Sequence, residues 1–146
     1  MKPYPIIKQE DKMDCGVASL ATMLLYYNQS YSLDYLKKIM DYNSRVGTTL
    51  LQLNNTAIKL HCSIEAIYIE NINELKSRML PCIAQITITD NVTHFVVIYK
   101  TNVHHLLIAD PAYGLKYINR SKYKSVFTGY FLLFPYNLNK KLLSIN

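Results

Sequence analysis

The spacing of apolar residues changes near residue 62, and this change constrains the fold more than any other feature. Before it, apolar side chains recur every three or four residues, as on one face of an α-helix. After it, they alternate or form short runs, as in β-strands. Helices that precede an antiparallel sheet predict an α+β fold with two layers around one core. A chain of 146 residues, 50% of them hydrophobic, is long enough for one such domain.

Three helices are expected in the first part of the chain. The first has Asp14 at its N-cap, where the carboxylate can accept hydrogen bonds from first-turn amides. The second begins near Ser32, and a third, weaker stripe starts at Leu50. The apolar stripe of the first helix has the spacing i, i+3, i+4, i+7 and consists of Val17, Leu20, Ala21 and Leu24.

The second part of the chain predicts an antiparallel sheet. The expected strands cover residues 62–69, 82–89, 94–100, 105–109, 115–118 and 130–134. Short helices are expected between residues 73 and 81 and over 121–127. Tight turns at 90–91 and 101–102 join the strands 82–89, 94–100 and 105–109, so these three are expected to form an antiparallel meander. Residues 137–146 have no strong pattern and are expected to form a tail or the start of a linker, outside a domain of residues 1–136.

Charge and cysteine content restrict the cellular setting. The net charge is +6, but the basic residues form no dense cluster, so no nucleic-acid partner is expected. No acidic residue follows Asp110, which indicates a basic face for an acidic peptide or lipid, or an ordinary solvated face. Three cysteines without a signal peptide favour a reducing, cytoplasmic location. No apolar run approaches the roughly 20 residues that a membrane span needs.

Cys15 is the candidate nucleophile. It stands at the predicted start of the first helix, where the helix dipole and unpaired amides favour negative charge, so a thiol there ionises more readily. The alternative is a small buried hydrophobic residue, the commonest fate of a lone cysteine. Cys62 and Cys82 are interpreted as strand core residues, and no Cys or His pair has the spacing of a metal site, so no metal or cofactor is expected.

A thiolate nucleophile needs a base, and the base needs an orienting group. Among the four histidines, His94 is preferred because it opens a buried strand; otherwise it is a solvent-exposed strand end. Asp110 closes the next strand, so antiparallel pairing would bring it to the same edge as His94, although Asp before Pro is also ordinary turn chemistry. Gln9 can donate to a developing oxyanion together with the Cys15 amide, or be a plain surface residue.

Together these segments resemble a known family, the bacteriocin-processing cysteine peptidases that are usually fused to the front of ABC exporters. Residues 9–20 resemble its nucleophile motif, residues 93–97 its histidine motif and residues 108–111 its aspartate motif. Residues 31–33, 47–49 and 129–134 also fit, so the resemblance covers about residues 4–135. It implies a papain-like cysteine peptidase fold.

The resemblance further implies cleavage of a leader peptide after a Gly-Gly pair, coupled to export of a bacteriocin or peptide pheromone. Cys15 would be the nucleophile, His94 the base and later acid, Asp110 the orienting carboxylate and Gln9 the oxyanion donor. The expected partners are a leader with an amphipathic helix and the membrane and nucleotide-binding parts of an exporter, at the inner face of the cell membrane. No GxxxxGK[ST] motif occurs here, which fits either an excised domain or a free-standing protease.

Two other functions stay open at this point. One is a non-cleaving domain that only docks the leader, and the other is a different papain-like thiol enzyme, such as an amidase or transglutaminase. Replacing Cys15 with alanine distinguishes the docking domain from a protease, because a protease loses turnover but keeps its leader affinity, whereas a docking domain changes little. Activity on side-chain amides that does not depend on the Gly-Gly pair would favour the other thiol enzyme.

Overall fold

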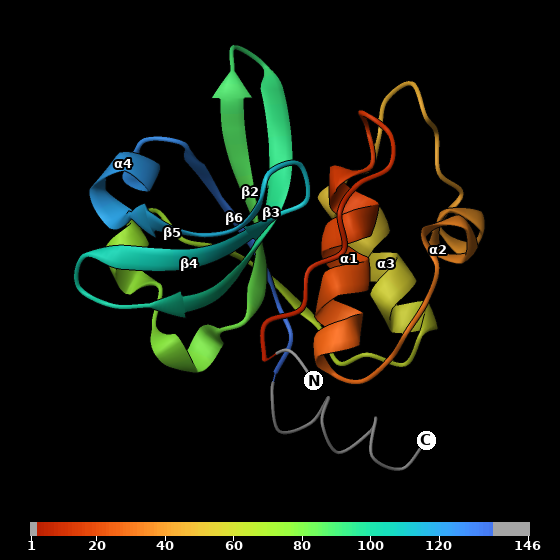
Figure 1. The fold of residues 1–146 in the computed structure, drawn as a ribbon, viewed down its shortest axis with the longest axis horizontal. Helices are drawn as coiled ribbons and strands as arrows, with labels where there is room; N and C mark the ends of the chain where they lie inside the picture. The colour runs from red at the N-terminus through yellow and green to blue at the C-terminus, as the bar shows by residue number, and fades with distance from the viewer. Residues whose placement is uncertain (1–2, 136–146) are drawn as a thin grey trace.

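A computed structural model of the chain describes residues 3–135, which form a helical layer packed against a twisted antiparallel sheet (Figure 1). The helical layer consists of α1 (Cys15–Tyr26), α2 (Leu33–Met40) and α3 (Leu50–Lys59). The sheet has the strand order β1-β6-β2-β3-β4-β5. Its strands are β1 (Glu65–Tyr68), β2 (Cys82–Thr89), β3 (Val92–Thr101), β4 (His105–Asp110), β5 (Gly114–Asn119) and β6 (Phe127–Leu133). The predicted α+β arrangement is confirmed.

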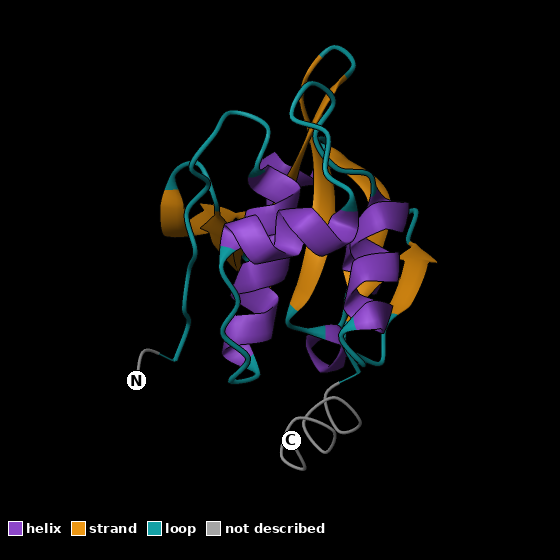
Figure 2. Cartoon of the chain, turned by 90° about the vertical axis from the view of Figure 1, so that its right-hand side faces the viewer, coloured by secondary structure: helices purple, strands orange, loops and turns teal. Residues whose placement is uncertain are grey.

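The central helix α1 is buried from residue 16 to residue 24 because it lies between the sheet and the other two helices (Figure 2). The flanking helices are amphipathic, and each has a side-chain cap at its N-terminus. The Ser32 hydroxyl accepts a hydrogen bond from the Tyr35 amide at 3.1 Å, and Thr49 and Gln52 form a capping box at the start of α3. Among the described residues, no helix is long and apolar enough to cross a membrane.

The role predicted for Asp14 at the start of α1 is wrong. Asp14 does occupy the N-cap position, but its side chain accepts no hydrogen bond from the first turn of the helix. The carboxylate turns away and accepts from the Asp11 amide, the Lys37 ammonium and the Tyr42 hydroxyl instead. An ion pair with a cation from the next helix therefore replaces the local cap.

The sheet follows the predicted meander closely in its centre and less well at its edges. The strand predicted at 62–69 shortens to β1, so Cys62 lies in the loop after α3, half-buried, rather than in a strand. Cys82 is in β2 and fully buried, as predicted. The helix expected between residues 73 and 81 is two single 3₁₀ turns, Ile72–Glu74 and Ser77–Met79.

The last elements begin earlier than the sequence pattern indicates. Helix α4 covers Arg120–Lys124, and β6 already starts at Phe127, where a helix was predicted. Gly129 explains the difference, because its positive φ of 99° breaks the regular alternation inside β6. The predicted tail, residues 137–146, lies outside the described residues.

Both faces of the sheet are buried, which explains the uninterrupted apolar run in β3. Side chains on one face pack against α1, and those on the other pack against the 3₁₀ turns and the segment around α4. The helix-facing group in β3 and β4 consists of Phe95, Val97, Tyr99, Leu107 and Ala109. The opposite group consists of Val96, Ile98, Leu106 and Ile108. A sheet covered on both sides holds its strand ends in fixed positions, which is what a site at its edge requires.

Candidate active site

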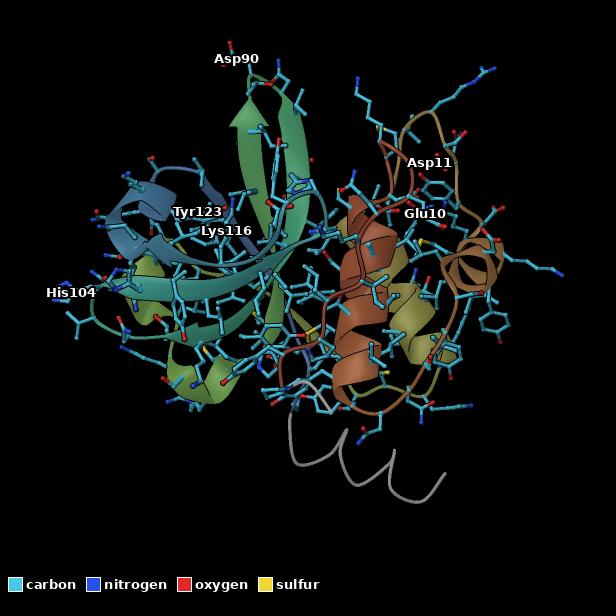
Figure 3. The ribbon with its side chains drawn as sticks, viewed as in Figure 1. Glu10, Asp11, Asp90, His104, Lys116 and Tyr123 are labelled. Carbon is cyan, nitrogen blue, oxygen red and sulfur yellow. The ribbon has the colours of Figure 1, made fainter. Side chains whose placement is uncertain are left out.

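A cleft of about 840 Å³ lies between the two layers at the N-terminal end of α1. On the helical side it is lined by the loop before α1 and by residues 46–48, and on the other side by β2–β5, their connecting turns and the α4 region. Figure 3 shows Glu10 and Asp11 in the loop that precedes α1, and Lys116 and Tyr123 on the sheet side. All four residues predicted from the sequence, Gln9, Cys15, His94 and Asp110, line this one cleft.

Cys15 is the first residue of α1 and is half-buried at the floor of the cleft. Its neighbour Gly16 is packed so tightly that an added Cβ would lie 3.0 Å from Cβ of Thr48 and 3.3 Å from the ring of Phe95. A residue with a side chain at position 16 would therefore push α1 away from β3. The glycine brings the start of the helix, and with it the sulfur, close to the strand that carries His94.

His94 and Asp110 form a buried hydrogen-bonded pair. The register of β3 and β4 pairs Val97 with Ala109, so Asp110 reaches diagonally along the sheet to His94. Nε2 of His94 lies 2.8 Å from Oδ1 of Asp110, and the two residues are 7% and 3% exposed. The same Oδ1 accepts a hydrogen bond from the Ala112 amide at 2.8 Å. Since Nε2 is taken by the carboxylate, Nδ1 is the ring nitrogen left for the hydrogen bond with the Cys15 thiol.

The electrostatics of the pair favour its charged form. Burial alone would lower the pKa of His94, but the hydrogen bonds to Asp110 and Cys15 outweigh it and raise the pKa to about 9. Burial alone would raise the pKa of Asp110, but the hydrogen bonds from His94 and from the Ala112 amide hold it below its ordinary value. At neutral pH the site therefore holds an imidazolium beside the thiol and an ionised carboxylate behind it.

Gln9 lines the same cleft as Cys15, and a backbone hydrogen bond fixes its position. The Gln9 amide N–H donates to the carbonyl of Pro111 at 3.0 Å, just after Asp110. Its side-chain nitrogen donates to the carbonyls of Asp11 and Lys12 at 3.1 and 3.2 Å, and its buried Oε1 has no hydrogen-bond partner among the described residues. The side-chain amide is in the cleft but is turned toward its own loop.

The walls of the cleft expose an unusual amount of apolar surface, which the sequence pattern did not identify. Apolar residues in a strand or a loop carry no sequence signal that distinguishes an exposed cleft wall from the core. Among the cleft residues, the large side chains left in solvent are Val46 (72% exposed), Ile88 (58%), Val92 (50%), Tyr113 (77%) and Tyr117 (64%). Exposed apolar surface gathered in a groove is typical of a site that binds a peptide or another protein.

The cleft offers no evident metal centre. Among residues 3–135, no group of three or more His, Cys, Asp and Glu side chains is arranged to hold a metal ion. Another of the four histidines, His104, lies at the far end of the sheet from α1 (Figure 3). The chemistry that the cleft can support is that of a thiol, an imidazolium and hydrogen-bond donors, which suits acyl transfer.

Comparisons with known proteins identify longer relatives of the chain. The chain is 31% identical over 125 residues to the colicin V secretion/processing ATP-binding protein CvaB of Escherichia coli, covering 86% of this chain. It is 33% identical over 131 residues to the lactococcin-G-processing and transport ATP-binding protein LagD of Lactococcus lactis subsp. lactis, covering 89% of this chain. The chain spans only 17% and 18% of the lengths of these two relatives.

Solved structures of similar size share the fold. The peptidase domain of Streptococcus ComA, a bifunctional ABC transporter involved in quorum sensing, matches with a TM-score of 0.80 and 28% identity over 90% of this chain and 98% of that domain. A double glycine motif protease from an AMS/PCAT transporter, solved in complex with the leader peptide, matches with a TM-score of 0.79 and 29% identity, covering 89% of each chain. The sequence model of the Peptidase C39 family matches residues 3–139, nearly the whole chain. The chain therefore belongs to the C39 family of peptidases.

Proposed function

We propose that this chain is a cysteine endopeptidase that removes the leader from a bacteriocin or pheromone precursor by cutting after a Gly-Gly pair. The observation that carries the proposal is the convergence of Cys15, His94 and Asp110 in one cleft, with the 2.8 Å hydrogen bond between the last two. Membership of the C39 family and the leader-bound relative support the same substrate class.

In the proposed mechanism, the Cys15 thiolate attacks the carbonyl carbon of the second glycine. The carbonyl π electrons move to oxygen, and the resulting oxyanion accepts hydrogen bonds from the Cys15 amide and from Gln9. When the C–N bond breaks, the imidazolium of His94 donates its Nδ1 proton to the leaving amine. His94 then removes a proton from water as the water oxygen attacks the thioester carbon; the C–S bond breaks, the leader leaves with a free carboxylate end, and the thiolate–imidazolium pair is restored. Asp110 holds the ring in position and stabilises its charged form throughout.

Gln9 must change its hydrogen bonds to play this part. Both N–H groups of its side chain are directed at the carbonyls of Asp11 and Lys12 in the free protein. Catalytic hydrogen bonds are often incomplete before substrate binds. We propose that a bound peptide draws one of these N–H groups to the oxyanion, while the Gln9 backbone stays fixed on Pro111.

The apolar walls of the cleft supply the surface for the leader. An amphipathic helix can bury its apolar face against exposed side chains such as Ile88, Val92 and Tyr117, which is a helix-in-groove mode of recognition. Glycine at both positions before the cut lets the extended end of the leader pass without a clash at Cβ. We propose that the domain acts on the cytoplasmic side, with the membrane and nucleotide-binding parts of an exporter as partners, as the names of its longer relatives suggest.

The test is incubation with a synthetic precursor that contains a leader and a Gly-Gly pair, followed by mass analysis of the products. We expect a single cut after the second glycine, no cut when the pair is replaced by Ala-Ala, and no cut by Cys15→Ala, which should still bind the leader. If the unmodified protein binds the leader as tightly as Cys15→Ala does but does not cut it, the chain is a docking domain. Activity on side-chain amides with indifference to Gly-Gly would make it another thiol amidase.

A further inference from the structure

A buried carboxylate next to the nucleophile is not used by the proposed mechanism. Asp14 directly precedes Cys15 and is completely buried, yet it does not cap the helix that Cys15 begins. A buried charge is costly unless it is paired and hydrogen-bonded, so the partners of Asp14 determine what it does beside Cys15.

The partners of Asp14 come from a different part of the fold. Nζ of Lys37, in α2, lies 2.9 Å from Oδ1 and 3.0 Å from Oδ2 of Asp14. The Tyr42 hydroxyl, just beyond the end of α2, donates to Oδ1 at 2.9 Å, and the Asp11 amide donates to Oδ2 at 2.9 Å. Burial alone would raise the pKa of Asp14, but these contacts hold it below its ordinary value. The carboxylate is therefore charged, and Lys37 is the cation that balances it.

The same contacts connect the nucleophile to the cleft wall. Tyr42 leads into the loop whose residues 46–48 line the cleft opposite the sheet. Gly47 of that loop packs on the turn before Cys15, since an added Cβ would lie 3.3 Å from the Met13 carbonyl oxygen. The ion pair thus joins the start of α1, α2 and the cleft wall into one unit.

We propose that Lys37 is a positioning residue for the reaction, which neutralises Asp14 beside the nucleophile so that the Cys15 thiolate can form. This inference rests on the proposed role of Cys15 as the nucleophile. The argument is electrostatic: an unbalanced negative charge one residue away opposes a second negative charge, whereas an unbalanced positive charge favours it. Loss of a merely structural contact would instead loosen the start of α1 and move the profiles of both single variants in the same direction.

Other charged and titratable groups lie around the cleft and near the pair, and a test must separate their effect from that of Lys37. They are His94 on β3, Asp110 on β4, Lys116, Tyr113 and Tyr117 on and beside β5, Lys122 and Tyr123 on α4, Glu10, Asp11 and Lys12 in the preceding loop, and Tyr42 after α2. None of these residues is itself substituted in Lys37→Met or Asp14→Asn, although Asp14→Asn changes the acceptor of the Tyr42 hydroxyl. The opposite directions expected for the two variants therefore report the charges of the pair.

The experiment measures the rate of iodoacetamide alkylation at Cys15 against pH, with the modified residue identified by peptide mass analysis. We expect the midpoint of the profile to move up by about one pH unit in Lys37→Met and down by a similar amount in Asp14→Asn. The double variant should return near the unmodified protein, because the loss of one positive and one negative charge at the same place nearly cancels; Asp11, 3.7 Å from Lys37 Nζ, is present in every variant. Lys37→Met should also lose about tenfold in kcat/KM at neutral pH and regain it at higher pH.

The matched control is Lys38→Met, which removes an exposed lysine from the same helix and should leave the profile unchanged. If Lys37→Met does not fold, the downward shift in Asp14→Asn and its reversal in the double variant decide the question. Unchanged midpoints, or shifts of both single variants in the same direction, would overturn the proposal. Because alkylation needs no substrate, opposite shifts in a protein that cuts no leader would reject the proposed function and leave the electrostatic role standing.

Discussion

At the scale of single residues, the site depends on one imidazole that is held charged by its neighbours. His94 has a carboxylate on Nε2 and a thiol facing its other nitrogen, and it is buried together with the carboxylate. It matters which ring nitrogen faces which partner. In the proposed mechanism, the nitrogen that faces the sulfur carries the proton that the leaving amine receives. The carboxylate of Asp110 fixes both the ring orientation and its charge.

Replacing the orienting carboxylate tests this arrangement. In Asp110→Asn the main partner that raises the pKa of His94 is lost, so the alkaline limb of the kcat/KM profile should move from about pH 9 toward the ordinary range of histidine. We also expect kcat to fall by about 10²-fold or more. NMR titration of His94 checks the pKa, and peptide cleavage checks the rate. Asp90→Asn, at an exposed turn, is the control; an alkaline limb that stays near pH 9 in Asp110→Asn would count against the assignment.

The oxyanion role proposed for Gln9 makes a separate prediction. Gln9→Ala should lower kcat by about 10²–10³-fold with little change in KM, because the lost hydrogen bond is made only in the transition state. Steady-state kinetics with a leader peptide provide the measurement. A raised KM at unchanged kcat would show that Gln9 contributes only to ground-state binding.

At the scale of elements, the sequence predicted the helices and strands whose buried side chains recur at regular spacing. The helices and the strands β2–β4 follow regular apolar patterns, and Asp110 ends β4 as its pattern predicts. His94 was expected to open its strand but is the third residue of β3, which begins at Val92. The edges were less predictable, because β1 is largely exposed and β6 contains a glycine with positive φ. The partners of Asp14 were missed, although Lys37 follows Leu33 by four residues on the buried side of α2, and a lysine there indicates an acidic partner.

The irregularity in β6 predicts a sharp requirement for glycine. At Gly129 an added Cβ would lie 2.6 Å from the Tyr68 ring and 2.8 Å from the Ile69 carbonyl oxygen, at a φ that other residues rarely adopt. We expect Gly129→Ala to lower the free energy of unfolding by about 2–3 kcal/mol, measured by chemical denaturation. Gly114→Ala has a similar φ but no close neighbour, so it should cost less. Equal losses in both variants would mean that the contact with β1 does not matter.

At the scale of the whole molecule, the site is assembled from the two layers, and each layer buries an ion pair of its own. Asp14 and Lys37 belong to the helical layer, while His94 and Asp110 belong to the sheet. Neither layer holds a complete site, since the sulfur comes from a helix and its base from a strand. Folding and site formation are therefore one event, and the stability of the protein should respond to the ionisation of the same groups.

This linkage predicts a stability maximum in mildly acidic solution. The raised pKa of His94 contributes stability that is complete below about pH 6.5 and is lost as the pH rises through about 9. The lowered pKa values of Asp14 and Asp110 contribute stability that is present above about pH 4 and is lost as the pH falls through their folded values. Urea denaturation between pH 3 and pH 10 measures this, and Asp110→Asn should flatten the alkaline decline. A stability that rises from pH 6.5 to 9 would contradict the charged pair.

The central claim is that the Cys15 sulfur itself attacks the carbonyl of the second glycine, and trapping the acyl-enzyme tests it most directly. A leader peptide is mixed with the protein, quenched in acid within the first turnover, and the intact protein and its peptides are weighed. We predict a thioester on Cys15 with the mass of the leader fragment that ends at the second glycine, less one water. Cleavage that proceeds at full rate after Cys15 is alkylated, with no adduct on that residue, would contradict the account.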